Sequence, residues 1–234
     1  MTWRIPLLIM VFAVALAVGM IVFWPLRAGL AATNAGSLGL SARDVTGTIW
    51  SGRLEGAALG VQPLGDVRAR VFFLPLLGGE TRLSLTGEGA FQGVFIRRGD
   101  AIAVEALDMR APISALGLSG SGTVTLSQAA FAFDSARCEA ASGRARIEGL
   151  AGSGWTAPML EGPLACEEGR LVARLHGQDA AVDLAATLAF DRSGRWTMDL
   201  VVRPADPLIS AALLAQGFQT GPDGLIYSTT GRLA

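Results

Sequence analysis

The sequence is poor in the side chains that catalysis usually recruits. Its 234 residues include no lysine, one histidine, one tyrosine and two cysteines, so all 19 basic residues are arginine. General acid–base and nucleophilic catalysis draw on those side chains, and a catalytic function is therefore disfavoured. Charge is scarce too, at 17% of residues with a formal net charge of −1, which excludes a polycationic nucleic-acid binder. Hydrophobic residues make up 51%, which excludes an intrinsically disordered chain.

The few candidates for a chemical site do not form a recognisable constellation. His176 ends an alternating run, and a strand-end or turn position explains it without catalysis. Glu161, Glu167 and Glu168 resemble a paired-carboxylate site, but the last two fall in a predicted hairpin turn, where solvated acids are ordinary. No spacing of His, Cys and acidic residues suits a metal, and no glycine-rich phosphate loop occurs. We therefore predict no catalytic, cofactor-binding or metal site.

A run without charge extends from residue 5 to residue 26, between Arg4 and Arg27. At 1.5 Å per residue, about 20 helical residues cross a hydrocarbon core of roughly 30 Å, so the run is long enough to span a membrane. Trp3 and Trp24 lie near its two ends, where indole rings favour the membrane interface. We therefore predict a single transmembrane helix over residues 5–26.

A cleaved signal peptide is the competing interpretation, because an alanine-rich stretch follows at residues 28–32. The apolar run exceeds the roughly 7–15 residues of a secretory signal, and no clear cleavage site follows it, so we favour an uncleaved anchor. Two positive groups, the N-terminal amine and Arg4, precede the run, and only Arg27 follows it directly. Because positive charge is enriched on the cytoplasmic side of membrane helices, this difference favours a cytoplasmic tail at residues 1–4. Residues 27–44, rich in small side chains, are then a linker.

The two cysteines, Cys138 and Cys166, both lie in the long portion beyond the apolar run. In an oxidising compartment they can form a disulfide. Closing the loop of about 29 residues between them would add roughly 3.5 kcal/mol to the stability of the fold in the chain-entropy model. The alternative is two buried free thiols in a cytosolic domain. We favour the disulfide, and with it a location of residues 45–234 in an oxidising compartment outside the cytoplasm.

Residues 45–234 follow a period of two, which is typical of strands with one buried face. In the clearest run, from Arg195 to Arg203, Trp196, Met198, Leu200 and Val202 alternate with polar side chains. Glycine-rich turn signals separate the runs at short intervals, for example at Arg98-Gly99-Asp100. This spacing predicts an antiparallel meander rather than βαβ units.

Helical pattern is confined to two short segments, residues 111–118 and 206–217. In the second, Asp206 can cap the first turn, Pro207 suits the first helical position, and Gly217 can end the helix. Both segments follow a strand ending in arginine and leave through glycine, which suggests two degenerate repeats divided near residue 128.

The most specific motif is the segment Val45-Thr46-Gly47-Thr48-Ile49-Trp50-Ser51-Gly52-Arg53. It resembles the opening of the mature domain in the type II secretion system protein N family, also called general secretion pathway protein N, where such a strand follows a single membrane helix. The family motif falls on Gly47, Thr48, Trp50 and Gly52. The resemblance covers roughly residues 1–233, although residues 78–127 carry no motif of the family.

The resemblance implies a non-catalytic accessory subunit in the inner membrane of Gram-negative bacteria, with its bulk in the periplasm. Its partners would be other type II secretion subunits of the inner membrane and periplasm. The expected fold is a curved antiparallel sheet like those of AsmA-like proteins, with Trp50 packed in the core or serving as an interface anchor. The alternative function is AsmA-like lipid handling or outer-membrane biogenesis, in which an apolar groove would bind lipid. A membrane-anchored hydrolase is disfavoured by the residue inventory.

Overall fold

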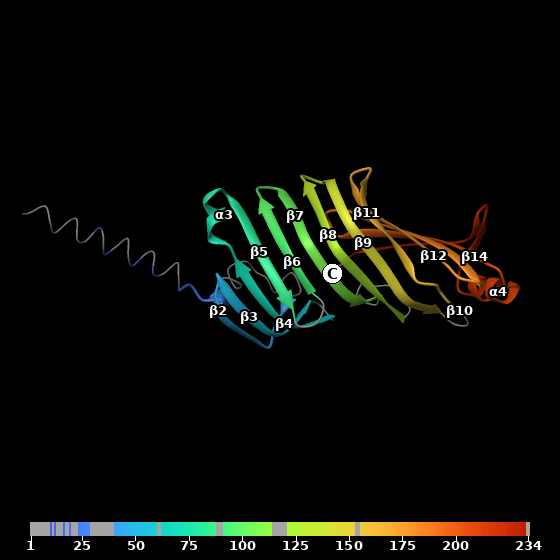
Figure 1. Ribbon diagram of the computed structural model, residues 1–234, viewed down its shortest axis with the longest axis horizontal. Coiled ribbons are helices and arrows are strands. Elements are labelled where there is room, and N and C mark those ends of the chain that lie inside the picture. The colour runs from blue at the N-terminus through green and yellow to red at the C-terminus, as the bar shows by residue number, and fades with distance from the viewer. Residues whose placement is uncertain are drawn as a thin grey trace, which may run out of the picture.

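A computed structural model describes residues 23–28, 40–59, 62–87, 91–113, 121–152 and 155–232, together with Met10, Phe12, Leu16 and Gly19. Its dominant feature is one antiparallel sheet of 16 strands (Figure 1). This confirms the predicted all-β antiparallel class. The first part of the sheet contains β1 (Leu40–Ser41), β2 (Asp44–Thr48), β3 (Ser51–Leu59), β4 (Gln62–Val71), β5 (Glu80–Gly87), β6 (Phe91–Arg98), β7 (Ala101–Pro112) and β8 (Ser121–Asp134).

The second part of the sheet follows directly in sequence. It contains β9 (Arg137–Gly152), β10 (Trp155–Thr156), β11 (Leu160–Glu167), β12 (Arg170–Gln178), β13 (Val182–Phe190), β14 (Arg195–Pro204), β15 (Gln219–Gly221) and β16 (Gly224–Arg232). From β3 to β9 each strand pairs with the next in the chain, and from β11 to β14 the same rule holds. The sheet is therefore the predicted meander, with short side branches where β2 pairs with β3 and β10 with β9.

Alternation of apolar and polar residues decides which face of each strand is buried. Along β14 the side chains of Trp196, Met198, Leu200 and Val202 are buried, as the period of two predicts. Tight hairpin turns join the strands where glycine permits a positive φ. At residues 168–169 both Glu168 and Gly169 have positive φ, which places them in the turn between β11 and β12.

Most of the buried side chains among the described residues form two clusters. The larger extends from Val104 in β7 to Leu225 in β16, and the smaller joins Leu26, Leu54, Ala57 and Val67. Figure 1 shows that the strands after β11 turn across the strands that precede them rather than continuing the same plane. The sheet is thus strongly curved, and its concave face holds the larger cluster.

Two short helices are described fully, and only one was predicted. Helix α4 (Pro207–Ala215) begins at Pro207, with the Asp206 carboxylate accepting a hydrogen bond from the Leu208 amide at 2.8 Å. This confirms the segment predicted at 206–217. Helix α3 (Phe73–Leu77), which follows the end of β4 at Val71, was not predicted.

The helix predicted at 111–118 is wrong at its start. Ala111 and Pro112 are the last residues of β7, where Ala111 pairs with Val124 of β8. The strand ladder outweighs the local helical pattern here because β7 is 12 residues long and its last four residues, Met109 to Pro112, pair continuously with β8. Residues 114–118 lie outside the described residues.

Most of the span predicted at residues 5–26 also lies outside the described residues. Within the part of the chain that is described, no helix has the length and hydropathy needed to cross a membrane. Strand pairing begins at Leu40, within the range assigned to the linker. The repeat boundary predicted near 128 falls inside β8, where Gln128 has a positive φ, and the duplication stays a prediction.

Candidate functional site

The family motif forms the hairpin between β2 and β3. Gly47 pairs with Gly52 and Thr48 with Ser51, so that Ile49 and Trp50 lie in the turn. The φ of Gly47 is +89°, and a Cβ there would lie 2.5 Å from the carbonyl oxygen of Ser51. Only glycine fits that position without breaking the hairpin.

Gly52 serves a different purpose, because it makes room for the segment that precedes the sheet. A Cβ on Gly52 would lie 2.2 Å from Cδ2 of Leu26, which is buried in the smaller cluster. The backbone joins the same contact: Pro25 forms a bridge with Thr48, and the Ile49 amide donates to the Trp24 carbonyl at 3.1 Å. The motif hairpin therefore holds the end of the apolar N-terminal run.

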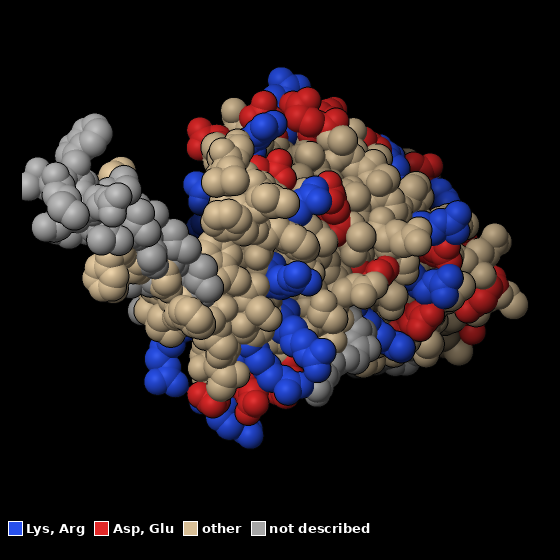
Figure 2. Space-filling model, turned by 60° about the vertical axis from the view of Figure 1, so that its left-hand side comes forward, with Lys and Arg blue, Asp and Glu red and all other residues tan. Residues whose placement is uncertain are grey.

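Trp50 lies beside this junction and is half-buried. Its ring meets Phe73 of α3 edge-on, with 5.5 Å between the ring centroids. Phe73, Leu74 and Leu77 of α3 are themselves 53%, 77% and 74% exposed. Figure 2 brings this end of the molecule forward and shows a broad area of uncharged surface between acidic and basic groups. Trp50 thus links the motif hairpin to an exposed apolar helix.

A second feature is a cavity on the concave face of the sheet, with a volume of about 380 Å³. Strands β7, β8, β9, β11, β12 and β13 all contribute to its wall, although β7 and β13 are far apart in the sheet order. The curvature of the sheet brings them together. Leu126, Ile147, Leu175 and Leu188 are typical of its lining, which is apolar except at the β13–β14 turn.

The open end of this cavity adjoins a wider, polar depression built from hairpin turns. The two share Asp191 and Arg192 of the β13–β14 turn. The depression is lined by five arginines and two acids, which are Arg137, Arg170, Arg192, Arg195, Arg232, Glu168 and Asp191. We call these residues the arginine-rich mouth. Its net charge is positive although the chain as a whole has a net charge of −1.

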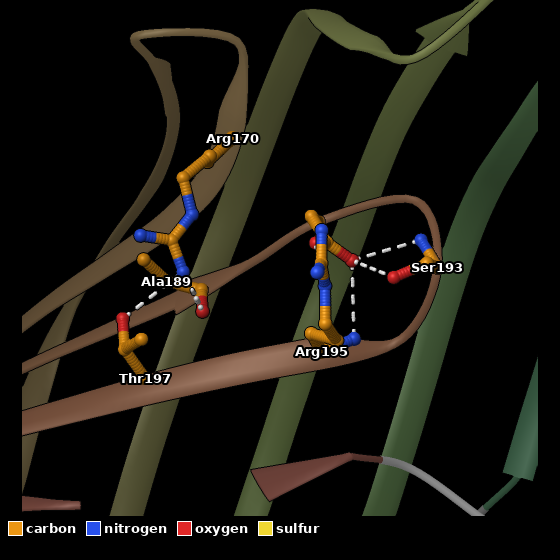
Figure 3. A network of polar contacts seen from close by, with 6 residues as sticks. Arg170, Ala189, Ser193, Arg195 and Thr197 are labelled. Atoms are coloured by element: carbon orange, nitrogen blue, oxygen red, sulfur yellow. Dashed lines mark hydrogen bonds and ion pairs between the residues drawn. The ribbon is translucent and has the colours of Figure 1, made fainter. Parts of the chain in front are cut away.

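The β13–β14 turn is held by a network around Asp191. One carboxylate oxygen accepts from the Ser193 amide at 2.9 Å and the Ser193 hydroxyl at 2.6 Å, and the other accepts from Nε of Arg195 at 2.8 Å. These hydrogen bonds, led by that of the Ser193 side chain, lower the pKa of Asp191 well below its usual range. Figure 3 shows the contacts of Ser193 and Arg195 beside those of Arg170, which donates to the Ala189 carbonyl and the Thr197 hydroxyl, each at 3.0 Å.

Cys138 and Cys166 are joined by a disulfide in the structure, with 5.5 Å between their Cα atoms. Next to it, the Cys138 amide donates to the Gly169 carbonyl at 2.8 Å. The bond connects β9 to β11 beside the arginine-rich mouth. It therefore fixes the turn that carries Arg137 against the turn before Arg170.

The candidate catalytic side chains are dispersed among ion pairs. Glu161 accepts from Arg146 at 2.8 Å and from Arg144 at 3.1 Å, and Glu167 accepts from Nε of Arg174 at 2.8 Å. Hydrogen bonds from these arginines lower the pKa of both glutamates, so they do not form an acid–base pair.

The one histidine lies inside a strand. His176 is in β12, two residues before its end, and its Nε2 lies 2.9 Å from Asp183 on β13. Its side chain is exposed, and it lies in neither the cavity nor the arginine-rich mouth. In the described part of the chain, no group of three or more His, Cys, Asp and Glu residues could hold a metal ion.

These features define a class: an all-β protein whose single curved sheet encloses an apolar cavity and whose first hairpin holds an apolar N-terminal segment. The family model described as type II secretion system (T2SS), protein N, matches residues 38–226. The chain belongs to that family, which confirms the resemblance based on the motif hairpin. No curated protein and no solved structure matches it.

Proposed function

We propose that the protein is a non-catalytic accessory subunit of the type II secretion system that supports transport of folded proteins from the periplasm across the outer membrane. The observation that carries the proposal is the family match, which covers nearly the whole sheet. Its partners are other inner-membrane and periplasmic subunits of the system, and nucleic acid is not among them.

The protein is a single-pass inner-membrane protein in this proposal, with residues 5–26 as the anchor. Support comes from the uncharged run itself and from the motif hairpin that binds its end at Trp24 and Leu26. Phe73 of α3 lies against Trp50 at the same junction, and the exposed side chains of Phe73, Leu74 and Leu77 would be covered by contact with the membrane interface.

The sheet lies in the periplasm, where the Cys138–Cys166 bond is stable because the compartment is oxidising. Partner subunits bind to the edge of the sheet. Beyond Ile226, the outer edge of β16 has no neighbouring strand among the described residues, since β15 pairs only with residues 224–226. An unpaired strand edge offers backbone groups to an added strand.

The test is fractionation of a secreted enzyme in a deletion strain complemented with the wild-type protein or with variants. Without the protein, we expect the exoenzyme to be folded and retained in the periplasm. His176→Ala is expected to restore secretion fully, because that side chain is exposed and its ion pair with Asp183 lies outside both the cavity and the arginine-rich mouth. Failure of His176→Ala to restore secretion would favour a catalytic function.

A second candidate function is AsmA-like lipid handling or outer-membrane biogenesis. The apolar cavity favours it, because the side chains of the protein leave about 380 Å³ between the walls of the curved sheet. The same deletion strain separates the two functions. Normal extracellular enzyme with an altered outer-membrane lipid content would support lipid handling and contradict the secretion proposal.

A further inference from the structure

The chemistry of the cavity wall restricts what can occupy it. Among the described residues that line it, only Asp191 and Arg192 carry charged or hydrogen-bonding side chains, and both lie in the turn that the cavity shares with the arginine-rich mouth. A peptide inserted past that turn would leave its amide and carbonyl groups without partners, which is costly in an apolar site. A hydrocarbon chain carries no such groups and fits the wall without that penalty.

The open end has the opposite character. The charge of Asp191 is matched by Arg195, which leaves Arg192 as the cation that lines both the cavity and the arginine-rich mouth. No acidic residue of the described chain forms an ion pair with Arg192. Close by, Trp196 is only 5% exposed, and its indole Nε1–H has no hydrogen-bond partner among the described residues. Trp196 also lines the mouth.

A buried donor without an acceptor is uncommon, since most buried polar groups are hydrogen-bonded. Because Nε1 is itself buried, an anion seated at the mouth would accept from the Trp196 indole once the ring turns its N–H toward the mouth, while the charge of the anion is met by Arg192. The two observations are independent, because one concerns charge and the other an unused donor. Both indicate a negatively charged acceptor at the end of an apolar cavity.

We propose that this cavity binds an anionic lipid through a single acyl chain, with the chain along the concave face and the headgroup between Arg192 and Trp196. The volume of about 380 Å³ lies near the lower end of ligand pockets, about 300–1,000 Å³, which fits one chain better than two. This inference deepens the lipid-handling candidate, on which it rests, and is independent of the secretion role.

The experiment uses the full chain in nanodiscs of zwitterionic phospholipid. A palmitate analogue with a photoreactive diazirine near the end of its chain is added, irradiated, and mapped by peptide mass spectrometry. We expect adducts on the cavity-lining parts of β8, β9 and β12. Unlabelled palmitate is expected to suppress the adducts far more than hexadecanol, which has the same chain but no charge.

Two substitutions locate the headgroup. Arg192→Glu is expected to reduce cavity labelling about tenfold, because a hydrogen bond to a charged group contributes about that factor. Arg98→Glu reverses the same charge beside another hairpin turn, at a residue that lines neither the cavity nor the arginine-rich mouth, and is expected to leave labelling unchanged. Leu126→Trp, which fills the cavity, is expected to abolish the adducts, with circular dichroism as the check on its fold.

The proposal is overturned if adducts are confined to residues 1–28, if the two arginine variants label equally, or if hexadecanol competes as well as palmitate. Secretion is measured in the same variants. If deletion blocks secretion but Arg192→Glu does not, the secretion function stands whether or not the lipid site exists. If Arg192→Glu reduces labelling while deletion leaves secretion normal, the lipid site stands and the secretion function fails.

Discussion

Gly47 and Gly52 face each other across the first hairpin, and different constraints hold them there. Gly47 needs its positive φ, whereas Gly52 needs the absence of a side chain so that Leu26 can approach. At the scale of single residues, the motif is therefore a docking surface for the N-terminal segment. Trp50 is half-buried beside that surface, so its truncation is expected to cost less than the about 3–5 kcal/mol of a fully buried aromatic.

The docking of Leu26 on Gly52 can be tested by a double-mutant cycle. Leu26→Ala is expected to cost about 2 kcal/mol, and Gly52→Ala to cost a similar amount because its methyl group displaces Leu26. Since both changes remove one contact, the double variant should be less destabilised than the sum by more than about 0.5 kcal/mol. Urea unfolding of the full chain in detergent measures this. Additive costs would mean that the two residues do not contact each other.

Asp191 predicts a pH dependence of stability. Its pKa is lowered in the folded protein relative to an ordinary value of 3.8, so the ionised form stabilises the fold above that pH. As pH falls below 3.8 the contribution is lost. Asp191→Asn is therefore expected to be less stable than the wild type by about 1 kcal/mol at pH 7, with the difference shrinking below pH 4. Denaturant midpoints across this range provide the measurement, and a difference that is constant with pH would contradict the prediction.

At the scale of elements, the strands and α4 follow local pattern, whereas the irregular segments do not. Helix α4 has a capping aspartate, a proline at its first position and a glycine beyond its end, so its bounds were predictable. Helix α3 has no such signals: its N-cap, Phe72, makes no side-chain cap, and none of its residues is buried. The local sequence therefore contains no capping residue and no buried face from which α3 could be predicted.

The junction between the paired strands β9 and β11, which we call the seam, leads to a prediction about the disulfide. The ladder between these strands pairs residues 144–147 with residues 160–163 and ends at Pro163, which has no amide hydrogen to donate. The Cys138–Cys166 bond closes the seam beyond that point. Replacing both cysteines by serine is expected to lower stability by about 3.5 kcal/mol and to speed amide exchange at residues 138–143.

The matched control is the wild-type protein after reduction and alkylation, which should behave like the double-serine variant. Equal stability of the oxidised protein and the variant would show that the bond does not hold the seam. Full alkylation of both thiols without reductant would show that the bond is not formed.

At the scale of the whole molecule, the curvature of the sheet decides where the cavity and its mouth lie relative to the motif hairpin. It brings Arg137, Arg170 and Arg192 together at one end of the cavity. The motif hairpin of β2 and β3 lies at the opposite end of the sheet from β12 and β14 (Figure 1). The proposed anchor and the proposed lipid site therefore lie on separate parts of the molecule, and variants of one should leave the other intact.

Topology is a prediction at this scale. Because residues 5–26 are proposed to span the inner membrane with the sheet outside the cytoplasm, alkaline phosphatase fused after Ala234 should be active. The matched control is the same fusion to a chain lacking residues 5–26, which should be inactive. Mass spectrometry should also find the N-terminus at Met1 or Thr2. A mature N-terminus near Ala32 would identify the run as a signal peptide instead.

The sequence by itself determined the all-β class, the meander, the buried face of β14, the bounds of α4 and the family, because each depends on residues close together in the chain. Alternation states which side chains point inward, but it does not state how far a sheet bends. Only the tertiary structure decided that β7 and β13 line one cavity, that five arginines from four places in the sequence gather at its mouth, and that Leu26 rests on Gly52. These contacts join residues separated by tens of positions, and accumulated strand twist, which no local pattern encodes, sets their distances.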